Sequence, residues 1–459
     1  MKIGFTAVSI KNPSLTERTM KNHLFYQTSK DLPFIEKANG PYIWDKSGKD
    51  YLDGSSGAIV CNLGYGNKKV ENAIMEQAKC SFFAYRLHFE NEPAWKLAEK
   101  LTEISADHLS RVYYVSGGSE AVETAMKLCR QYYYSKGETG KTLFISRKPS
   151  YHGCTLGALA LTTYAPLEQP FRPLMQSYPK ISAPYCYRCP HKLCYPECGL
   201  ACAHELESTI LEYGPDNIAA FIAEPVGGAS TGAVTPPDGY FAIIEETCKK
   251  YGIMLILDEV MTGFGRTGKF FGYNHWNVKA DIVAMSKGMA SGYYPLGAVI
   301  TTEEIVGEVL KTGFAHGHTY AGNPMACAVG IAVIDEIIER NLPDNAAKMG
   351  AILKDGLKNL AGAHSMIGDV RGKGLLLGIE LVEERDTKKP FPNKKNASQL
   401  LADIAHDEGL IIYPRRSMNG LAGDHLVVAP PLIVTEKDIN VLLMRLDKAL
   451  IRTEKELNK

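Results

Sequence analysis

The stretch 252-GIMLILDEV-260 decides the fold, and the earlier stretch 217-NIAAFIAEPV-226 shares its pattern. Both are nearly continuous apolar runs that end in carboxylates, Glu224 in one and Asp258 with Glu259 in the other. Strands that are buried on both faces of a parallel sheet have this composition. Because ligands of such sheets bind at the carboxyl ends of the strands, we expect a functional site beside these carboxylates.

The segments around these runs alternate between strand and helix patterns. A strand is expected over residues 111–116, a helix over 117–134, and short strands over 280–288 and 295–302. Residues 40–57 alternate apolar and turn residues, as a β-meander does. The sequence therefore predicts an α/β protein: a large domain with a central, mostly parallel sheet flanked by helices, and a smaller α+β domain.

Both ends of the chain are expected to form the smaller domain. Residues 1–60 would supply its N-terminal part and residues 325–459 its C-terminal part, while residues 61–324 would form the large domain. The C-terminal part begins with helical patterns over 325–341 and 346–362. Three strands are then expected among further helices, over residues 372–381, 409–414 and 425–432.

The amino-acid composition argues against some classes of binding partner. Lys plus Arg and Asp plus Glu both number 51 in 459 residues, which argues against nucleic acid or an anionic membrane as a partner. No stretch approaches the roughly 20 apolar residues of a membrane-spanning helix. Residues 1–20 lack the long apolar region of a secretory signal. We therefore expect a cytoplasmic protein whose cysteines are mostly reduced.

Two further features suggest chemistry at the sheet edge. Lys287 follows an apolar strand, where desolvation lowers the pKa of an amine and makes it nucleophilic. Gly117, Gly118 and Ser119 form a turn that opens a helix and can bind a phosphate. A phosphate site, the buried carboxylate of Asp258 and an amine able to form a Schiff base together suit pyridoxal phosphate.

Six motifs resemble those of the class III aminotransferases, which belong to the pyridoxal-phosphate fold type I superfamily. They are SGGSEAVETAMK, YHGCTLGAL, AEPVGGASTG, LDEVMTGFGRTG, MSKGMASGYYPLGAV and HTYAGNP. The resemblance spans nearly the whole chain. It implies a ping-pong enzyme that moves an amino group from an ω-amine or an ω- or β-amino acid to a keto acid, with pyruvate the expected acceptor.

The resemblance also implies the residues around the cofactor ring. Lys287 would carry the cofactor as a Schiff base and later shuttle a proton. Asp258 would pair with the ring nitrogen, and Glu224 would help to fix Asp258. Val260 and Tyr151 would pack on opposite faces of the ring. Val260 stands two residues beyond Asp258, which would place it on the same face of a strand.

The phosphate and the subunit interface follow from the same resemblance. The turn at residues 117–119 would hold the phosphate, and His152 would lie beside the ring-packing tyrosine. Thr319 would reach the phosphate of the partner subunit. The resemblance therefore implies a homodimer, or a tetramer, with active sites at the subunit interface.

Three departures narrow the substrate class. Met261 stands where the ornithine and 4-aminobutyrate branches commonly carry a glutamine. Ala229 and Val427 stand where those branches pair a glutamate with an arginine. The pattern is closer to the ω-amine:pyruvate type, which includes the β-alanine, taurine and diamine aminotransferases.

Four residues are candidates for contacts with the substrate. Ile59 stands where relatives often carry a large aromatic residue, which suggests room for a longer substrate, and Tyr85 could line the same pocket. Arg415 and Arg416 are candidates to bind the carboxylate of a keto acid, because arginine binds carboxylates through two parallel hydrogen bonds. The alternative is that both arginines are solvated loop residues.

Two other functions remain open at this stage. One is a racemase or aminomutase built on the same scaffold. The other is a regulator that depends on zinc or an iron–sulfur cluster and is built around the run at residues 185–203. That run holds five of the eleven cysteines, which could bind a structural metal or pack a loop as reduced thiols. They are Cys186, Cys189, Cys194, Cys198 and Cys202.

Overall fold

A seven-stranded sheet forms the centre of the computed structural model, which describes residues 23–24 and 30–459. The N-terminal residues considered above for a secretory signal lie outside the described residues. The order in the sheet is β4-β10-β9-β8-β7-β5-β6. The strands are β4 (Arg111–Val115), β5 (Leu143–Lys148), β6 (Lys180–Ser182), β7 (Ile218–Ala223), β8 (Met254–Asp258), β9 (Ile282–Met285) and β10 (Gly297–Thr301).

Strands β5 to β9 pair in parallel, and only β10 runs antiparallel to its two neighbours, β4 and β9. This confirms the predicted mostly parallel sheet. Every residue of β7 and β8 is buried, as their continuous apolar sequences indicate. Burial of apolar surface stabilises these central strands by roughly 25 cal/mol per Å² removed from water.

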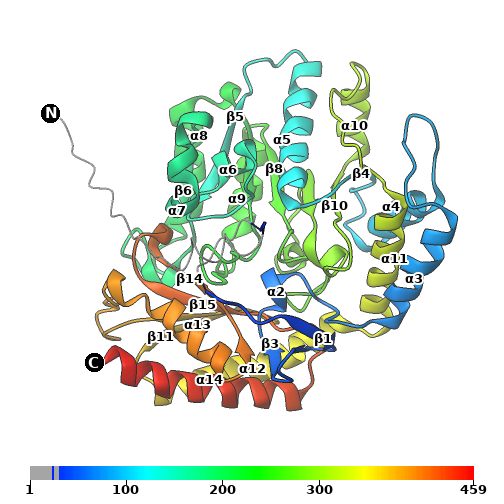
Figure 1. The fold of residues 1–459 in the computed structure, drawn as a ribbon. Helices are drawn as coiled ribbons and strands as arrows, with labels where there is room; N and C mark the ends of the chain where they lie inside the picture. The colour runs from blue at the N-terminus through cyan, green and yellow to red at the C-terminus, as the bar shows by residue number, and fades with distance from the viewer. Residues whose placement is uncertain (1–22, 25–29) are drawn as a thin grey trace.

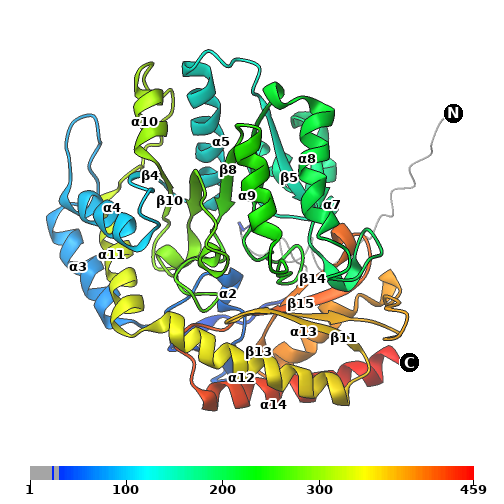
Figure 2. The same ribbon diagram turned by 180° about the vertical axis from the view of Figure 1, so that it is seen from behind.

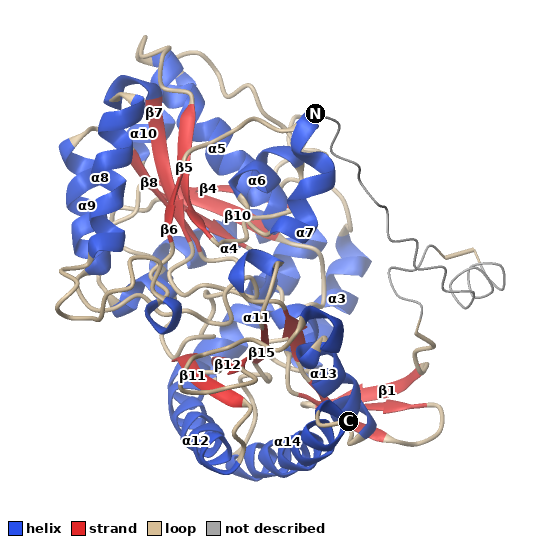
Figure 3. Ribbon diagram, turned by 90° about the vertical axis from the view of Figure 1, so that its left-hand side faces the viewer, coloured by secondary structure: helices blue, strands red, loops and turns tan. Residues whose placement is uncertain are grey.

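Helices cover both faces of this sheet (Figure 1, Figure 3). One layer contains α5 (Gly118–Ser135), α6 (Leu156–Leu161) and α10 (Glu303–Leu310). The opposite layer contains α8 (Ala201–Tyr213) and α9 (Tyr240–Lys250). The predicted helix over 117–134 is therefore α5, and it begins directly after β4.

The smaller part of the molecule contains two four-stranded sheets, ordered β1-β2-β3-β13 and β11-β12-β15-β14. Because β13 pairs with β3 in parallel, the N-terminal and C-terminal segments share one sheet, as the fold class predicts. The strands are β1 (Ile35–Asn39), β2 (Tyr42–Asp45), β3 (Asp50–Asp53), β11 (Ile367–Lys373), β12 (Leu376–Leu381), β13 (Leu410–Ile411), β14 (Tyr413–Arg415) and β15 (Asp424–Val428).

Long helices pack beside these small sheets (Figure 2). They are α12 (Leu342–Ala363), α13 (Ala397–Asp407) and α14 (Glu436–Leu457). Helix α11 (Pro324–Glu339) instead packs on α3 (Lys68–Cys80) and α4 (Glu92–Ile104) before the chain enters α12. Domain boundaries near residues 60 and 324 therefore remain a proposal, with α11 as the connection. Within the described ranges, no helix is both long and apolar enough to cross a membrane.

Two glycines of α12 give a direct test of the packing of this helix. A Cβ at Gly350 would collide with the backbone of Gly374, whereas a Cβ at Gly362 would meet nothing within 4 Å. We expect Gly350→Ala to lower the free energy of unfolding by about 1–3 kcal/mol, because the backbone cannot move aside. Gly362→Ala should raise it by up to about 1 kcal/mol through helix propensity.

Chemical denaturation of both variants measures the difference. Equal effects of the two substitutions would contradict the described packing of α12 on the turn between β11 and β12.

Candidate active site

A cavity of about 140 Å³ lies at the carboxyl ends of β7 and β8. Of the residues predicted from the sequence to contact the cofactor, only Gly117 and Thr319 do not line it. Gly117 directly precedes the lining residues of α5. The lining residues are Gly118, Ser119, Tyr151, His152, Gly153, Glu224, Val226, Gly228, Ala229, Asp258, Val260, Met261, Thr262 and Lys287.

Lys287 reaches this cavity from the turn after β9. Its backbone has a φ of 46°, a left-handed conformation that is uncommon for a residue with a side chain. Among the described residues, the Lys287 amine has no hydrogen-bond partner. Burial lowers the pKa of Lys287 to about 8, although Asp258 and Glu224 oppose the shift. A large share of the amine is therefore neutral and nucleophilic near that pH.

Asp258 is the last residue of β8, and hydrogen bonds hold both of its carboxylate oxygens. His152 Nδ1 lies 2.8 Å from Oδ2, and the backbone N–H of Val260 donates to Oδ1 at 3.0 Å. His152 is buried, and its Nε2 has no partner in the described structure. When the Asp258 carboxylate is ionised, His152 Nδ1 donates this hydrogen bond.

Glu224 lines the same cavity as Asp258, as expected, but its hydrogen bonds go to other partners. Its carboxylate accepts hydrogen bonds from the backbone N–H of Tyr151, at 2.9 Å, and from that of Gly228. It therefore fixes two loops at the cavity wall and does not hold Asp258. The contact expected between Glu224 and Asp258 is replaced by the one from His152, because the amide groups of the two loops satisfy the glutamate.

Val260 lines the cavity for a reason other than strand alternation. Strand β8 ends at Asp258, so the argument that both residues share a strand face is wrong. A turn held by the Val260 N–H places the side chain instead. The valine then packs against Gly118, where a Cβ would lie only 2.7 Å from Val260 Cγ1. Glycine at position 118 therefore permits this close approach.

The start of α5 suits an anion. Gly117 is the N-cap, and no side chain caps the helix, so the first N–H groups of an 18-residue helix remain open. The Ser119 hydroxyl lies in the same turn and accepts a hydrogen bond from the Cys154 N–H at 3.0 Å. An unpartnered amine, the carboxylate of Asp258 and an uncapped helix terminus fit pyridoxal phosphate.

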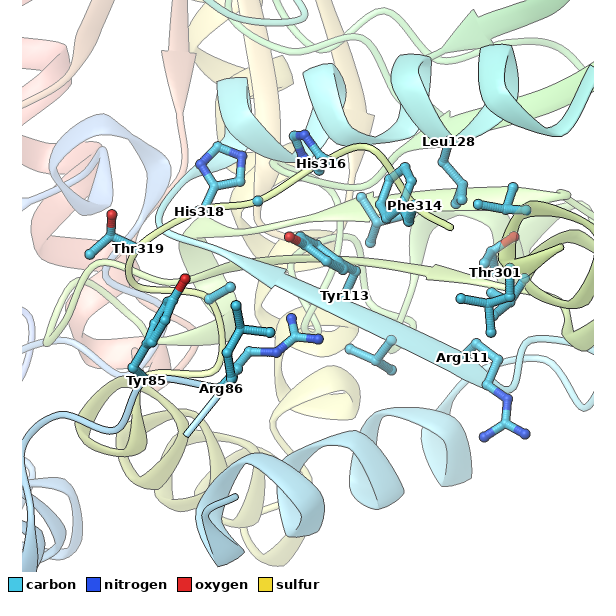
Figure 4. Close-up of a pocket in the computed structure, with 18 residues that line it drawn as sticks. Tyr85, Arg86, Arg111, Tyr113, Leu128, Thr301, Phe314, His316, His318 and Thr319 are labelled. Carbon is cyan, nitrogen blue, oxygen red and sulfur yellow. The ribbon is translucent and has the colours of Figure 1, made fainter. Parts of the chain in front are cut away.

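Tyr85 and Thr319 line a second, larger cavity of about 680 Å³. Lys287 does not line it. Figure 4 shows the two residues at one end of this cavity and Arg111 with Thr301 at the other. Within one chain, the structure brings Tyr85 and Thr319 together but separates them from the Lys287 cavity.

Ile59 belongs to α2 (Ser56–Ile59) and is 1% exposed. It packs in an apolar cluster with Val226 and Val427, and Met261 packs against this cluster from the cavity wall. Ile59 therefore lies behind the cavity lining. Val427 thus belongs to an apolar cluster and not to the glutamate–arginine pair of the other branches.

The structure distinguishes the two candidate arginines. Arg416 donates to both oxygens of Asp424, at 3.1 and 3.3 Å, and Asp424 is fully buried. Arg415 stacks on the ring of Tyr413, 4.7 Å from its centroid, and donates to its hydroxyl at 2.7 Å. The charge of Arg415 also contributes to the lowered pKa of Lys287, after burial. Arg415 thus has no carboxylate partner among the described residues, whereas Arg416 is paired with Asp424.

The cysteine run forms a loop that protein contacts hold in place. Tyr185 and Arg188 both donate to the buried carboxylate of Glu380 in β12. Within residues 23–24 and 30–459, no group of three or more His, Cys, Asp or Glu is placed to hold a metal ion. Cys194 is exposed, and burial raises the pKa of Cys202 to about 12, which disfavours the thiolate that binds metals. Of the two alternatives that the sequence left open for this run, a structural metal is therefore unsupported.

Sequence reasoning missed several lining residues. Gly153, in the YHG motif, has a φ of 140°, and Gly228 supplies an N–H to Glu224. Two adjacent glycines, three and four residues after the strand-ending Glu224, were the available signal for Gly228. Thr262, which donates to Glu259, carried no signal because hydroxyl residues are common in turns.

The Lys287 amine provides a test of this site that needs no substrate. In the full-length protein freed of cofactor, acetylation of Lys287 by acetic anhydride should rise with pH around a midpoint near 8. Mass spectrometry of its peptide measures the rate, with Lys250 as an internal reference, because an ion pair with Glu207 raises the pKa of that lysine. A Lys287 midpoint near the ordinary value of about 10.5 would contradict the site geometry.

Comparison with known proteins identifies the family of this site. The family described as Aminotransferase class-III matches residues 25–450. The uncharacterized aminotransferase YodT of Bacillus subtilis is 39% identical over 437 residues, which cover 94% of this chain and 98% of that protein. The taurine–pyruvate aminotransferase of Bilophila wadsworthia is 37% identical over 454 residues, which cover 96% and 97%.

A solved structure supports the same family assignment. An amine transaminase from an uncultivated Pseudomonas species, in the PLP-bound form, superimposes with a TM-score of 0.88 at 33% identity. The match covers 94% of this chain and 99% of that chain. The chain therefore belongs to the class III aminotransferases, fold type I enzymes for which pyridoxal phosphate is the expected cofactor.

Proposed function

We propose that this protein transfers an amino group from an ω-amine, or an ω- or β-amino acid, to a keto acid, with pyruvate as the expected acceptor. One observation carries the proposal: the unpartnered amine of Lys287 lines the same cavity as the hydrogen-bonded pair of Asp258 and His152. The taurine–pyruvate aminotransferase among the relatives supports this choice of substrates.

The lining residues provide a place for each part of pyridoxal phosphate. Lys287 would hold the aldehyde carbon, and Asp258 would face the ring nitrogen. The start of α5, with Gly117, Gly118 and Ser119, would bind the phosphate. Tyr151 and Val260 would pack against the ring. When bound, pyridoxal phosphate supplies an electron sink for the carbanion that forms when the substrate carbon loses its proton.

The chain supplies proton transfer and electrostatic control. A lysine amine with a pKa near 8 can take up a proton from a substrate carbon and return it at neutral pH. Asp258 stays oriented because His152 and the Val260 N–H hold both oxygens. A carboxylate fixed in this way can keep an adjacent ring nitrogen protonated. The apolar side chains of Val226 and Met261 line the same cavity and would limit the access of water to a bound substrate.

Two of the sequence departures support this substrate class. Val427 is buried with Ile59 and Val226 in an apolar cluster, so no charged group stands at this position. The carbonyl oxygen of Ala229 accepts a hydrogen bond from His425, so this loop has a structural partner of its own. These contacts favour the ω-amine:pyruvate type. In this proposal Arg415, rather than Arg416, binds the carboxylate of the keto acid.

A homodimer completes the site in this proposal. Thr319 and Tyr85 line an open cavity that lacks Lys287, so a second copy could bring them to the partner's cofactor. The neighbouring loop exposes apolar side chains, with Phe82 71%, Leu87 79% and Phe89 71% exposed. Exposed apolar groups of this density mark an interface. The number of subunits beyond two is left open.

A cytoplasmic location is part of the same proposal. All eleven cysteines are free in the structure, including the five in the run at residues 185–203. A reducing compartment maintains such thiols, whereas an oxidising one would favour disulfides.

The requirement for a keto acid distinguishes this reaction from the alternatives. With an amine donor alone, the loaded protein should form about one equivalent of carbonyl product and then stop, because each site must return its amino group. Pyruvate should restore continuous turnover. Lys287→Ala should slow the reaction by roughly 10²–10⁴-fold. Continuous turnover of the amine without a keto acid would instead indicate a racemase or aminomutase, and product formation can be followed by chromatography.

Arg415 provides a test of acceptor binding. Arg415→Leu should raise KM for pyruvate about tenfold to a hundredfold, because a charge-assisted pair of hydrogen bonds is lost. KM for an amine donor without a carboxylate should change little. Arg415→Lys, which keeps the charge but not the planar fork, should give an intermediate KM. An equal loss for both substrates would contradict this role.

A further inference from the structure

Arg266 is the largest fully buried side chain in the described structure. It lies in the loop after β8, in the motif LDEVMTGFGRTG, and sequence analysis assigned it no role. No carboxylate of the described residues lies within ion-pair distance of its guanidinium. A buried cation without a counter-ion is unfavourable unless other groups compensate it, so its presence requires an explanation.

Four neutral acceptors satisfy the Arg266 guanidinium. Nη1 donates to the carbonyl oxygens of Leu375 at 3.0 Å and Pro430 at 2.6 Å. Nη2 donates to the Ser56 hydroxyl at 3.2 Å and to Asn62 Oδ1 at 2.7 Å. Nε is buried without a partner. The guanidinium thus joins the N-terminal, central and C-terminal segments without a direct ion pair.

Asn62 connects Arg266 to the reacting lysine. Its amide nitrogen donates to the Phe264 carbonyl oxygen at 2.9 Å, which fixes the orientation of the amide. A Cβ on Gly288 would collide with this same amide, so Asn62 packs directly on the backbone next to Lys287. Arg266, Asn62, Gly288 and Lys287 therefore form a contiguous chain of contacts.

Few charged groups act on Lys287 and Arg266. Asp258 and Glu224 favour the protonated form of Lys287, whereas Arg266 and Arg415 disfavour it. Around Arg266, the charged or titratable neighbours are Asp53 and Cys61. The Asp53 carboxylate accepts hydrogen bonds from Ser55, Gly57 and Tyr65. Burial is the largest cause of the lowered pKa of Lys287, and the positive charge of Arg266 acts in the same direction.

We propose that Arg266 is a positioning residue for Lys287: it orients Asn62, Asn62 packs on Gly288 and holds the lysine backbone, and the buried guanidinium adds a positive charge near the amine. The inference rests on the proposed function, in which Lys287 is the reacting amine. It explains why an arginine, and not an apolar residue, fills this buried position.

Asn62→Asp tests the charge with almost no change of shape. The new carboxylate would face Arg266 Nη2 and neutralise its field, and it would also attract a proton to Lys287 directly. Both effects favour the protonated amine, so the midpoint of Lys287 acetylation in the cofactor-free protein should rise by roughly one pH unit. At pH 7 the acetylation rate should fall about tenfold.

Arg266→Lys is the matched control. It keeps the positive charge but loses the fork that reaches four acceptors. The Lys287 midpoint should therefore stay near its original value, while kcat of the loaded protein falls because the lysine backbone is less well held. Arg266→Met should raise the midpoint as Asn62→Asp does. Circular dichroism and thermal melting select the folded variants, and Arg266→Gln takes the place of Arg266→Met if Arg266→Met does not fold, because the carboxylate of Asn62→Asp also acts on Lys287 directly.

An unchanged midpoint in folded Asn62→Asp would overturn the proposal, as would an equal shift in Arg266→Lys and Asn62→Asp. Because acetylation needs neither cofactor nor substrate, a missing aminotransferase activity would count against the proposed function alone.

Discussion

Asp258 must be satisfied at the end of a fully buried strand, and the rest of the site is arranged around this constraint. The apolar residues of β8 bring its carboxylate to an edge where water is largely excluded. His152 holds one oxygen, and the turn that places Val260 against Gly118 holds the other. The same burial leaves Lys287 with a lowered pKa. One physical condition, desolvation at the sheet edge, therefore fixes the orientation of the acid and the reactivity of the amine.

Much of this arrangement could be predicted from the sequence because it depends on local composition. The continuous apolar runs of β7 and β8 indicated buried parallel strands, and the carboxylates at their ends indicated the site. Strand β5 was missed because Ser146 and Arg147 interrupt its apolar pattern. Both are buried; the Ser146 hydroxyl donates to the carbonyl oxygen of Leu161, and Arg147 Nη2 donates to that of Glu224. Such contacts with distant segments cannot be recognised in the sequence of the strand itself.

Other differences have the same cause. Residues 409–414 were expected to form one strand, but β13 and β14 divide this segment between two sheets. Residues 372–381 were expected to form another, but a turn at Gly374, with a φ of 55°, separates β11 from β12. Arg416 was a candidate substrate residue until its contact with the buried Asp424 was known. Arg266 depends on segments more than 100 residues away in the chain, so the sequence alone could not assign it a role.

The central claim is that Lys287 is the residue that bonds pyridoxal phosphate. Borohydride reduction of the loaded protein, followed by peptide mass spectrometry, tests it most directly. The account predicts that the reduced cofactor is attached to the Lys287 peptide and that Lys287→Ala retains none after reduction and dialysis. Attachment to another lysine, or a Lys287→Ala variant that keeps full aminotransferase activity, would contradict it.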